Sequence, residues 1–158
     1  MKPISRRRVV AAISAAGAGT CVCGLSGGCA SVSKVGKTVP IATDAYVIEA
    51  TKVVVDLSQV AALNEVGGSA KIIDARLPTP LIIARTDKTE YAVVSLLCPH
   101  RGVEVEYRHQ DKQFRCASLG HSRFGTDGAF NKGPAAKPLN AYAATLDPAD
   151  RTSLVITL

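Results

Sequence analysis

The feature that most constrains this 158-residue chain is a pair of short loops, each with one cysteine and one histidine. The first contains Cys98 and His100, and the second runs from Cys116 to His121, with 15 residues between His100 and Cys116. Thiolate sulfur and imidazole nitrogen are typical metal ligands. Residues i and i+2 of an extended loop project to the same side, so Cys98 and His100 can face one site. The fold is therefore expected to bring both loops to one metal centre.

The other cysteines and the third histidine are expected to lie outside this site. The chain has five cysteines and three histidines, and Cys21, Cys23 and Cys29 fall in an N-terminal targeting segment. His109 falls at the turn of a predicted hairpin between the two loops, where an exposed residue is expected. The candidate ligands are Cys98, His100, Cys116 and His121.

Two cysteines and two histidines leave two interpretations open. A structural zinc site needs four tetrahedral ligands and usually takes its cysteines in closely spaced pairs. A two-iron cluster can take both thiolates at one iron and both imidazoles at the other. Each loop here contains one cysteine and one histidine, and this arrangement favours the two-iron cluster. A zinc-stabilised or metal-free β domain, acting as a structural or assembly subunit, remains the alternative.

Residues 98–142 resemble a Rieske [2Fe-2S] domain. The signature of that family is C-x-H, a hairpin, C-x2-H, and then a Gly-Pro-Ala-x-x-Pro-Leu loop that ends near a tyrosine. The matching residues that follow the ligand loops are Phe124, Gly128, Gly133-Pro134-Ala135, Pro138-Leu139 and Tyr142. The second ligand pair departs from the pattern, because it reads C-x4-H. The resemblance implies one [2Fe-2S] cluster per chain, held by the four candidate ligands.

The resemblance also implies which residues surround the cluster. Ser122 either gives its hydroxyl to a bridging sulfide or bonds its own backbone. Pro134 stiffens a loop that covers the cluster. Phe124 stands where high-potential members have a tyrosine, and their extra disulfide is missing, since its positions hold Val103 and either Ala117 or Ser118. We therefore expect a redox potential in the lower part of the roughly −150 to +300 mV Rieske range.

The first 30 residues are predicted to be a targeting segment. They begin with basic residues, contain no acid, and continue with an uncharged run of 22 residues from Val9 to Ala30. The string around Arg6-Arg7-Arg8 resembles a twin-arginine export signal. Three outcomes stay open: removal by cleavage, lipidation of Cys29, and retention as a membrane anchor, of which cleavage or lipidation is favoured.

Composition limits the function classes. The chain carries 19 Lys+Arg and 13 Asp+Glu, but four of the basic residues and none of the acids lie in residues 1–30, which leaves a net charge of only +2 beyond that segment. This balance does not indicate nucleic-acid binding. Residues 31–45 are predicted to be a linker, and residues 46–158 suit one small domain.

The domain is predicted to be all-β, a Rieske-like antiparallel β-sandwich or partial barrel with a cluster-binding subdomain at about residues 96–138. Val103, Val105 and Tyr107 alternate with charged residues, as in one half-buried arm of a hairpin. Other strand signals are at 53–55, 71–73, 81–84, 91–94, 143–146 and 154–156. Residues 58–64 are expected to form a short helical turn with Ser58 as its N-cap.

Together these features predict an exported one-electron carrier, alone or as a subunit of a periplasmic or membrane-associated oxidoreductase, with no catalytic site of its own. The expected location is the periplasm or the outer face of the cytoplasmic membrane, and the expected partner is a cytochrome or an oxidoreductase subunit. Between Cys98 and Lys137 the sequence holds seven Lys/Arg and four acids. This positive rim either steers an acidic partner or is an ordinary solvated surface.

Overall fold

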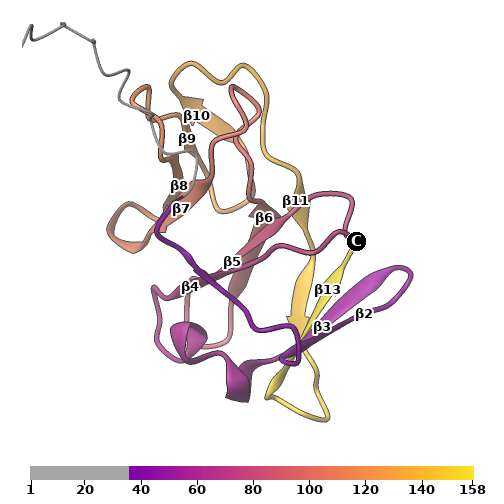
Figure 1. Cartoon of the computed structure of the whole chain (residues 1–158). Coiled ribbons are helices and arrows are strands. Elements are labelled where there is room, and N and C mark those ends of the chain that lie inside the picture. The colour runs from indigo at the N-terminus through magenta and orange to yellow at the C-terminus, as the bar shows by residue number, and fades with distance from the viewer. Residues whose placement is uncertain (1–35) are drawn as a thin grey trace, which may run out of the picture. The chain divides into compact units, whose positions relative to one another are not determined.

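A computed structural model describes residues 36–158, and the predicted targeting segment lies outside these residues. Thirteen strands form three sheets (Figure 1), which confirms the all-β class. The helical elements within 36–158 are three single 3-10 turns: η1 (Leu57–Gln59), η2 (Ala61–Leu63) and η3 (His109–Asp111). None of the helices in this part of the chain is long and apolar enough to cross a membrane.

The central sheet has five strands in the order β1-β4-β5-β6-β11. Their bounds are β1 (Val39–Pro40), β4 (Ser69–Ile72), β5 (Leu81–Arg85), β6 (Tyr91–Ser95) and β11 (Ala141–Tyr142). β1 runs parallel to β4, and the remaining pairs are antiparallel. The apolar runs of β5 and β6 have no polar alternation because both faces of this sheet are covered.

Each face of the central sheet belongs to a different hydrophobic core. Leu81, Ile83 and Val93 pack into one core, whereas Ile82 and Val94 pack into the other. Successive side chains of a strand point to opposite faces, so one strand supplies both cores. The first core joins the central sheet to the base sheet, and the second joins it to the sheet that carries the ligand loops.

The base sheet is a four-stranded antiparallel sheet in the order β12-β13-β3-β2. Its strands are β12 (Ala144–Leu146), β13 (Ser153–Thr157), β3 (Lys52–Asp56) and β2 (Tyr46–Ile48). The expected strand at 143–146 corresponds to β12 of the base sheet. Asp56, not Ser58, caps the following 3-10 turn, since its side chain accepts a hydrogen bond from the Ser58 backbone at 3.0 Å.

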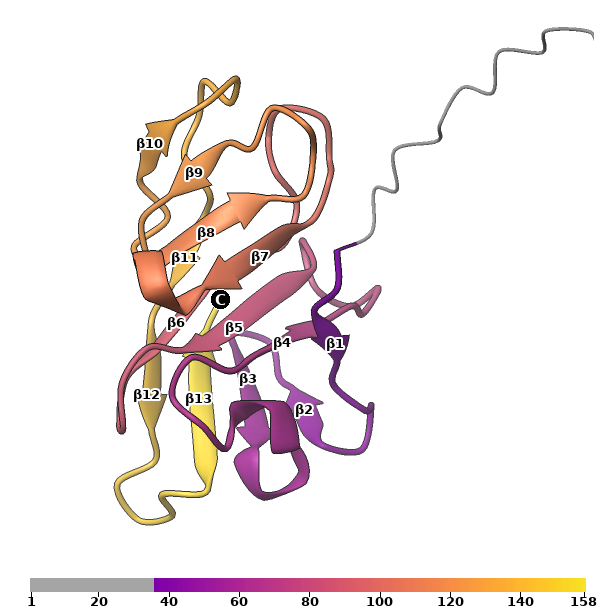
Figure 2. The same ribbon diagram turned by 90° about the vertical axis from the view of Figure 1, so that its left-hand side faces the viewer.

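The ligand sheet is the four-stranded antiparallel sheet β10-β9-β8-β7, seen with its strands side by side in Figure 2. Its strands are β7 (Val105–Arg108), β8 (Gln113–Cys116), β9 (Arg123–Phe124) and β10 (Phe130–Lys132). Its inner face is aromatic: the Tyr107 and Phe114 ring centroids lie 5.3 Å apart, and Phe114 is opposite the buried Phe124. The predicted hairpin is confirmed, with exposed His109 at its turn.

The predicted linker of residues 31–45 differs from the structure wherever the structure describes it. Residues 36–45 are docked on the domain: β1 pairs with β4, and Ile41 and Ala45 are buried. The Gly36 backbone N–H also donates to the Glu104 carboxylate at 2.7 Å. This segment has no periodic pattern of its own, and it is held by residues that are distant in sequence. Its sequence alone therefore did not indicate that it packs on the domain.

The hairpin departs from strict alternation at Glu104, which is buried although it was expected to face solvent. Its carboxylate forms an ion pair with the buried Lys71, with Nζ–O distances of 3.0 and 2.8 Å. Lys71 and Glu104 are only 4% and 6% exposed. This pair ties β4 of the central sheet to the segment that leads from the first ligand loop into β7.

Replacing Lys71 with methionine is expected to lower the free energy of unfolding by about 3–5 kcal/mol, because it leaves a buried carboxylate without its partner. The midpoint of urea unfolding measures the loss. Lys52→Met is the matched control, since Lys52 pairs with Glu49 at the surface and such pairs contribute about 0–1 kcal/mol. Equal stability of the two variants would contradict a structural role for the buried pair.

Candidate metal centre

The β7–β8 hairpin brings the starts of the two ligand loops together. Cys116, the last residue of β8, lies opposite Val105 in the ladder. In the first ligand loop, the Cys98 backbone N–H donates to the Val103 carbonyl at 2.9 Å. In the second ligand loop, the Ala117 N–H donates to the Glu104 carbonyl at 2.9 Å. Residues 103–105 therefore contact both loops, which places the predicted Cys98 and Cys116 at one end of the ligand sheet.

The two cysteines are buried and free. Each is 1% exposed, and both belong to the core that includes Val103, Val105 and Phe124. Burial raises the pKa of the Cys98 thiol, the His100 backbone N–H opposes that rise, and the neighbouring Cys116 adds to it. The Cys116 thiol donates to the buried Ser118 hydroxyl at 3.1 Å. Both sulfurs thus lie in the apolar core, on the dry side of the site.

His100 follows on the first loop and is half-buried. Its Nδ1 atom is buried and has no hydrogen-bond partner among residues 36–158. A buried polar atom without a partner costs free energy unless something else satisfies it. A metal ion bound to Nδ1 would do so, and the orphaned nitrogen is therefore an independent sign that the first loop holds a metal ligand.

His121 ends the longer second loop in a left-handed conformation, with φ of 44°. Its backbone N–H donates to the Ser118 carbonyl at 3.0 Å, and its Nδ1 lies 3.3 Å from the Cys116 carbonyl oxygen. A ring that donates from Nδ1 to a carbonyl keeps its lone pair on Nε2, so Nε2 is the atom available to a metal. The left-handed conformation thus falls on His121 itself, and the neighbouring Gly120 does not have a positive φ.

Gly120 and Gly133 permit a close approach between the second ligand loop and the proline-containing loop. A Cβ on Gly120 would lie 2.7 Å from Pro134 Cγ, and one on Gly133 would lie 2.6 Å from Ser122 Cα. The Ala135 N–H donates to the fully buried Ser122 hydroxyl at 3.1 Å, and that hydroxyl also lowers the pKa of Cys98. Ser122 and Pro134, both predicted to surround the site, thus hold the two loops together.

Phe124, the third predicted neighbour, is fully buried and packs edge-on against Phe130 with ring centroids 6.2 Å apart. It offers no hydroxyl to a sulfur atom. Val103 is also buried, at 4% exposure, and fills space with an apolar side chain. The surroundings of the cysteines are therefore apolar apart from the Ser118 and Ser122 hydroxyls.

The donor set fits a two-iron cluster better than a zinc ion. A structural zinc site would need all four side chains as ligands of one metal ion. A Rieske cluster needs fewer protein ligands per metal ion, since each iron takes only two and inorganic sulfide bridges the irons. Two buried thiols and the orphaned His100 nitrogen match that demand, and His121 offers the fourth donor.

Comparison with protein families decides the identity. The family model of the Rieske [2Fe-2S] domain matches residues 52–143, more than half of the chain. The chain belongs to this family. Its cofactor is accordingly a [2Fe-2S] cluster, and the match spans both ligand loops and all the strands from β3 to β11.

Two solved Rieske structures resemble the domain. The ferredoxin of carbazole 1,9a-dioxygenase from Nocardioides aromaticivorans shares 23% identity, with a TM-score of 0.51 over 70% of this chain and 95% of that one. The plasma membrane Rieske protein of the cyanobacterium Synechocystis shares 21% identity, with a TM-score of 0.44 over 52% of this chain and 81% of that one. A search of curated proteins found no match. The ferredoxin supports the Rieske fold.

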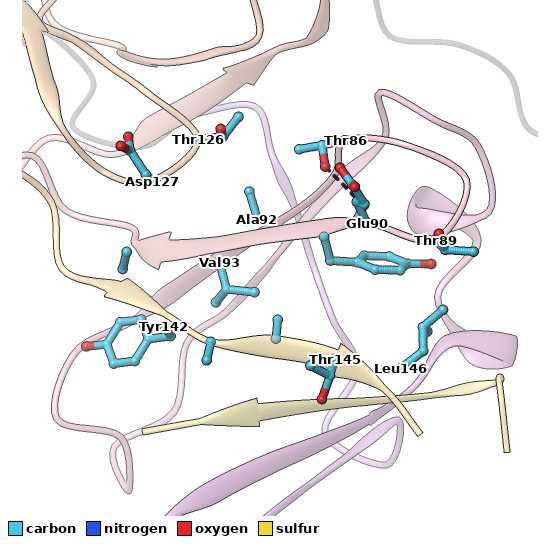
Figure 3. Close-up of a pocket in the computed structure, with 14 residues that line it drawn as sticks. Thr86, Thr89, Glu90, Ala92, Val93, Thr126, Asp127, Tyr142, Thr145 and Leu146 are labelled. Carbon is cyan, nitrogen blue, oxygen red and sulfur yellow. Dashed lines mark hydrogen bonds between the residues drawn. The ribbon is translucent and has the colours of Figure 1, made fainter. Parts of the chain in front are cut away.

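A pocket of about 540 Å³ lies away from the ligand loops of the Rieske domain, along β6, β11 and β12 (Figure 3). Its walls are mainly alanine and threonine side chains, together with the carboxylates of Glu90 and Asp127. The Thr86 hydroxyl donates to the Glu90 carbonyl at 3.1 Å. None of the four candidate ligands lines this pocket, so it is separate from the metal centre.

Gly133→Ala is expected to destabilise the Rieske domain more than Gly102→Ala. Both glycines have positive φ, +113° and +65°, but nothing lies within 4 Å of a Cβ added to Gly102. That control should lose about 1–2 kcal/mol, the usual strain of a left-handed residue. Gly133→Ala should lose at least about 1 kcal/mol more, because the Ser122 backbone must move. Urea unfolding measures both, and equal losses would contradict the close contact.

Proposed function

We propose that the protein is an exported one-electron carrier whose cluster is held by Cys98, His100, Cys116 and His121. What supports this proposal is that two neighbouring loops carry two buried free thiols and a buried imidazole nitrogen, Nδ1 of His100, without a hydrogen-bond partner among the described residues. When bound, a Rieske cluster accepts and releases single electrons. The protein supplies the ligands, the apolar surroundings and the route to solvent.

The two ligand types divide the site into a dry side and an accessible side. The cysteines are 1% exposed and sit in the core of the ligand sheet, which excludes water from the sulfur side. His100 and His121 are half-buried, so they lie nearer the surface. Electrons would enter and leave past the imidazoles, because this is the side that a partner can approach closely.

A redox partner protein follows from this role. A carrier works between a donor and an acceptor, and a cytochrome or an oxidoreductase subunit would accept single electrons. The domain would act alone or as a subunit of a periplasmic or membrane-associated oxidoreductase, without a substrate pocket of its own. The residues that line the pocket along β6 include no cysteine, serine, histidine or lysine.

The export proposal depends on the N-terminal sequence, which lies outside the described residues. A twin-arginine route carries folded proteins, and a cluster must be inserted before export, so the Arg6-Arg7-Arg8 segment and a cluster domain suit each other. The protein would work in the periplasm or at the outer face of the cytoplasmic membrane. Cys29 lipidation or a retained segment would attach it there.

His121→Ala is expected to abolish cluster binding, whereas His109→Ala should leave it intact. The His121→Ala variant would lose the fourth ligand of the cluster. His109 is exposed and lies against Gly67 at the turn of the hairpin, away from the ligand loops. Purified wild-type protein should be red-brown, with about two irons and two acid-labile sulfides per chain. Metal and sulfide analysis with an absorption spectrum measures the change.

Three results would contradict the assignment in different ways. A colourless wild-type protein that contains zinc would establish the structural alternative. A full cluster in the His121→Ala variant would show that another residue completes the C-x4-H loop. Loss of the cluster in the His109→Ala variant would show that the hairpin turn matters for ligation.

The wild-type potential is expected in the lower part of the roughly −150 to +300 mV range, because Phe124 and Val103 replace the supports found in high-potential members. Ser118→Ala should lower it further. As a ligand, Cys116 would carry no proton, so the Ser118 hydroxyl would turn to donate to its sulfur and favour the reduced state. Losing a hydrogen bond of about 0.5–1.5 kcal/mol corresponds to roughly 20–60 mV for one electron.

A spectroscopic redox titration measures this shift. Ser153→Ala is the matched control, since the Ser153 hydroxyl bonds Asp150 in the base sheet region, away from the ligand loops. An unchanged potential in Ser118→Ala would show that the hydroxyl does not contact the sulfur when the cluster is bound.

A further inference from the structure

The outer face of the ligand sheet carries a row of basic residues that run across neighbouring strands. The ladder places Glu106 opposite Arg115, Arg115 opposite Arg123, and Arg123 opposite Lys132. A bulge in β10 between Phe130 and Lys132 brings Lys132 into this register. Phe114 and Phe124 alternate with these residues and point into the core. We call Arg115, Arg123 and Lys132 the basic row.

The positive charges of the basic row are not neutralised by ion pairs with acidic side chains of residues 36–158. Like charges directly opposite each other on paired strands are destabilising. The acid at the end of the row, Glu106, is already engaged: it pairs with Arg108 at 3.1 Å and accepts the Lys37 backbone N–H at 2.8 Å. No described carboxylate forms an ion pair with any member of the row.

Arg115 gives the row a directional donor that lacks an acceptor. Its Nε is buried and has no hydrogen-bond partner within the described part of the chain. An arginine side chain binds carboxylates through several N–H donors held in one plane. The Nε of Arg115 is a donor that no described residue satisfies, so the described residues leave the hydrogen-bonding capacity of this guanidinium incompletely used.

Charge is unevenly divided along the domain. Residues 98–137 hold seven Lys/Arg and four acids, and two of those acids, Glu104 and Glu106, are paired with Lys71 and Arg108. When these paired residues are set aside, six Lys/Arg and two acids remain in residues 98–137. The rest of residues 36–158 carries seven Lys/Arg and nine acids. Such a division orients an approaching protein, because its acidic face is drawn to residues 98–137 and repelled from the rest of the domain.

The basic row also flanks the second ligand loop. Arg115 directly precedes Cys116, and Arg123 follows His121 by two residues. Between them, Leu119 at the loop is 81% exposed. An exposed apolar side chain on a loop that is flanked in sequence by two arginines suits a protein interface, which has an apolar centre and a polar rim. Figure 2 shows that β8 and β9, which bear the two arginines, are adjacent strands.

We propose that the basic row is the docking surface for the acidic face of the redox partner protein, an inference that rests on the proposed function. A partner held there would lie beside His121, where an electron can be exchanged. A membrane surface would provide anionic groups but no electron acceptor at that position. The partner is therefore a protein whose own redox centre is bordered by aspartate and glutamate.

The first experiment measures binding of dye-labelled poly-L-glutamate to the full chain by fluorescence anisotropy. The triple variant Arg115→Gln/Arg123→Gln/Lys132→Gln should bind at least about tenfold more weakly than wild type at low salt, and raising the salt should remove the difference. The matched control Lys52→Gln/Lys88→Gln/Arg151→Gln removes three charges from outside the ligand sheet. It should change binding by less than about twofold.

The second experiment measures electron transfer from the dithionite-reduced protein to two small oxidants. Ferricyanide is an anion and hexaamminecobalt(III) is a cation, so the basic row should attract the first and repel the second. The row variant should slow oxidation by ferricyanide and speed oxidation by the cobalt complex, with little change in the control. Unfolding midpoints of both variants show whether they are folded.

The outcomes separate the docking surface from the proposed function. Poly-L-glutamate binding needs no cluster, so a protein without iron would overturn the electron-carrier function alone. Equal poly-L-glutamate binding by folded row and control variants would overturn the docking surface alone. Tighter, row-dependent binding to phosphatidylglycerol vesicles than to poly-L-glutamate would assign the row to a membrane surface and overturn the protein partner.

Discussion

The pairing of β7 with β8 is the constraint on which the metal centre depends. The cysteine loops are far apart in sequence, and the register that sets Val105 opposite Cys116 is what brings them together. A slip of one residue would turn Cys116 outward and bury a charged neighbour. Phe114, held between Tyr107 and Phe124, makes that slip costly because its ring fills the core. Core packing thus fixes the positions of the ligands.

The sequence was sufficient to predict the features that arise locally. Alternating apolar residues predicted the hairpin, and the apolar runs at 81–84 and 91–94 predicted strands, because these patterns reflect the geometry of a strand itself. The meeting of Cys98 with Cys116 followed from the hairpin between them. The Rieske resemblance gave the same loops, and the family match covers them.

Contacts between distant residues were not predictable in this way. Glu104 looked like an outward residue of an alternating strand, and its burial depends on Lys71, which lies 33 positions away. Residues 36–45 looked like a linker because their partners lie on β4 and in the hairpin, so no local pattern records them. The left-handed conformation of His121 likewise results from how the longer loop closes on Ser118.

The second ligand loop is held against the proline-containing loop by noncovalent contacts. Ser122 is packed against Gly133, and its hydroxyl accepts the Ala135 N–H, while Pro134 lies against Gly120. A side chain at either glycine would clash, at Gly120 with the ring of Pro134 and at Gly133 with the backbone of Ser122. This packing of the two loops therefore requires that both glycines keep their small size. The hairpin register brings Cys98 and Cys116 together, and the close approach at Gly120 and Gly133 sets how the loop that contains His121 lies against its neighbour.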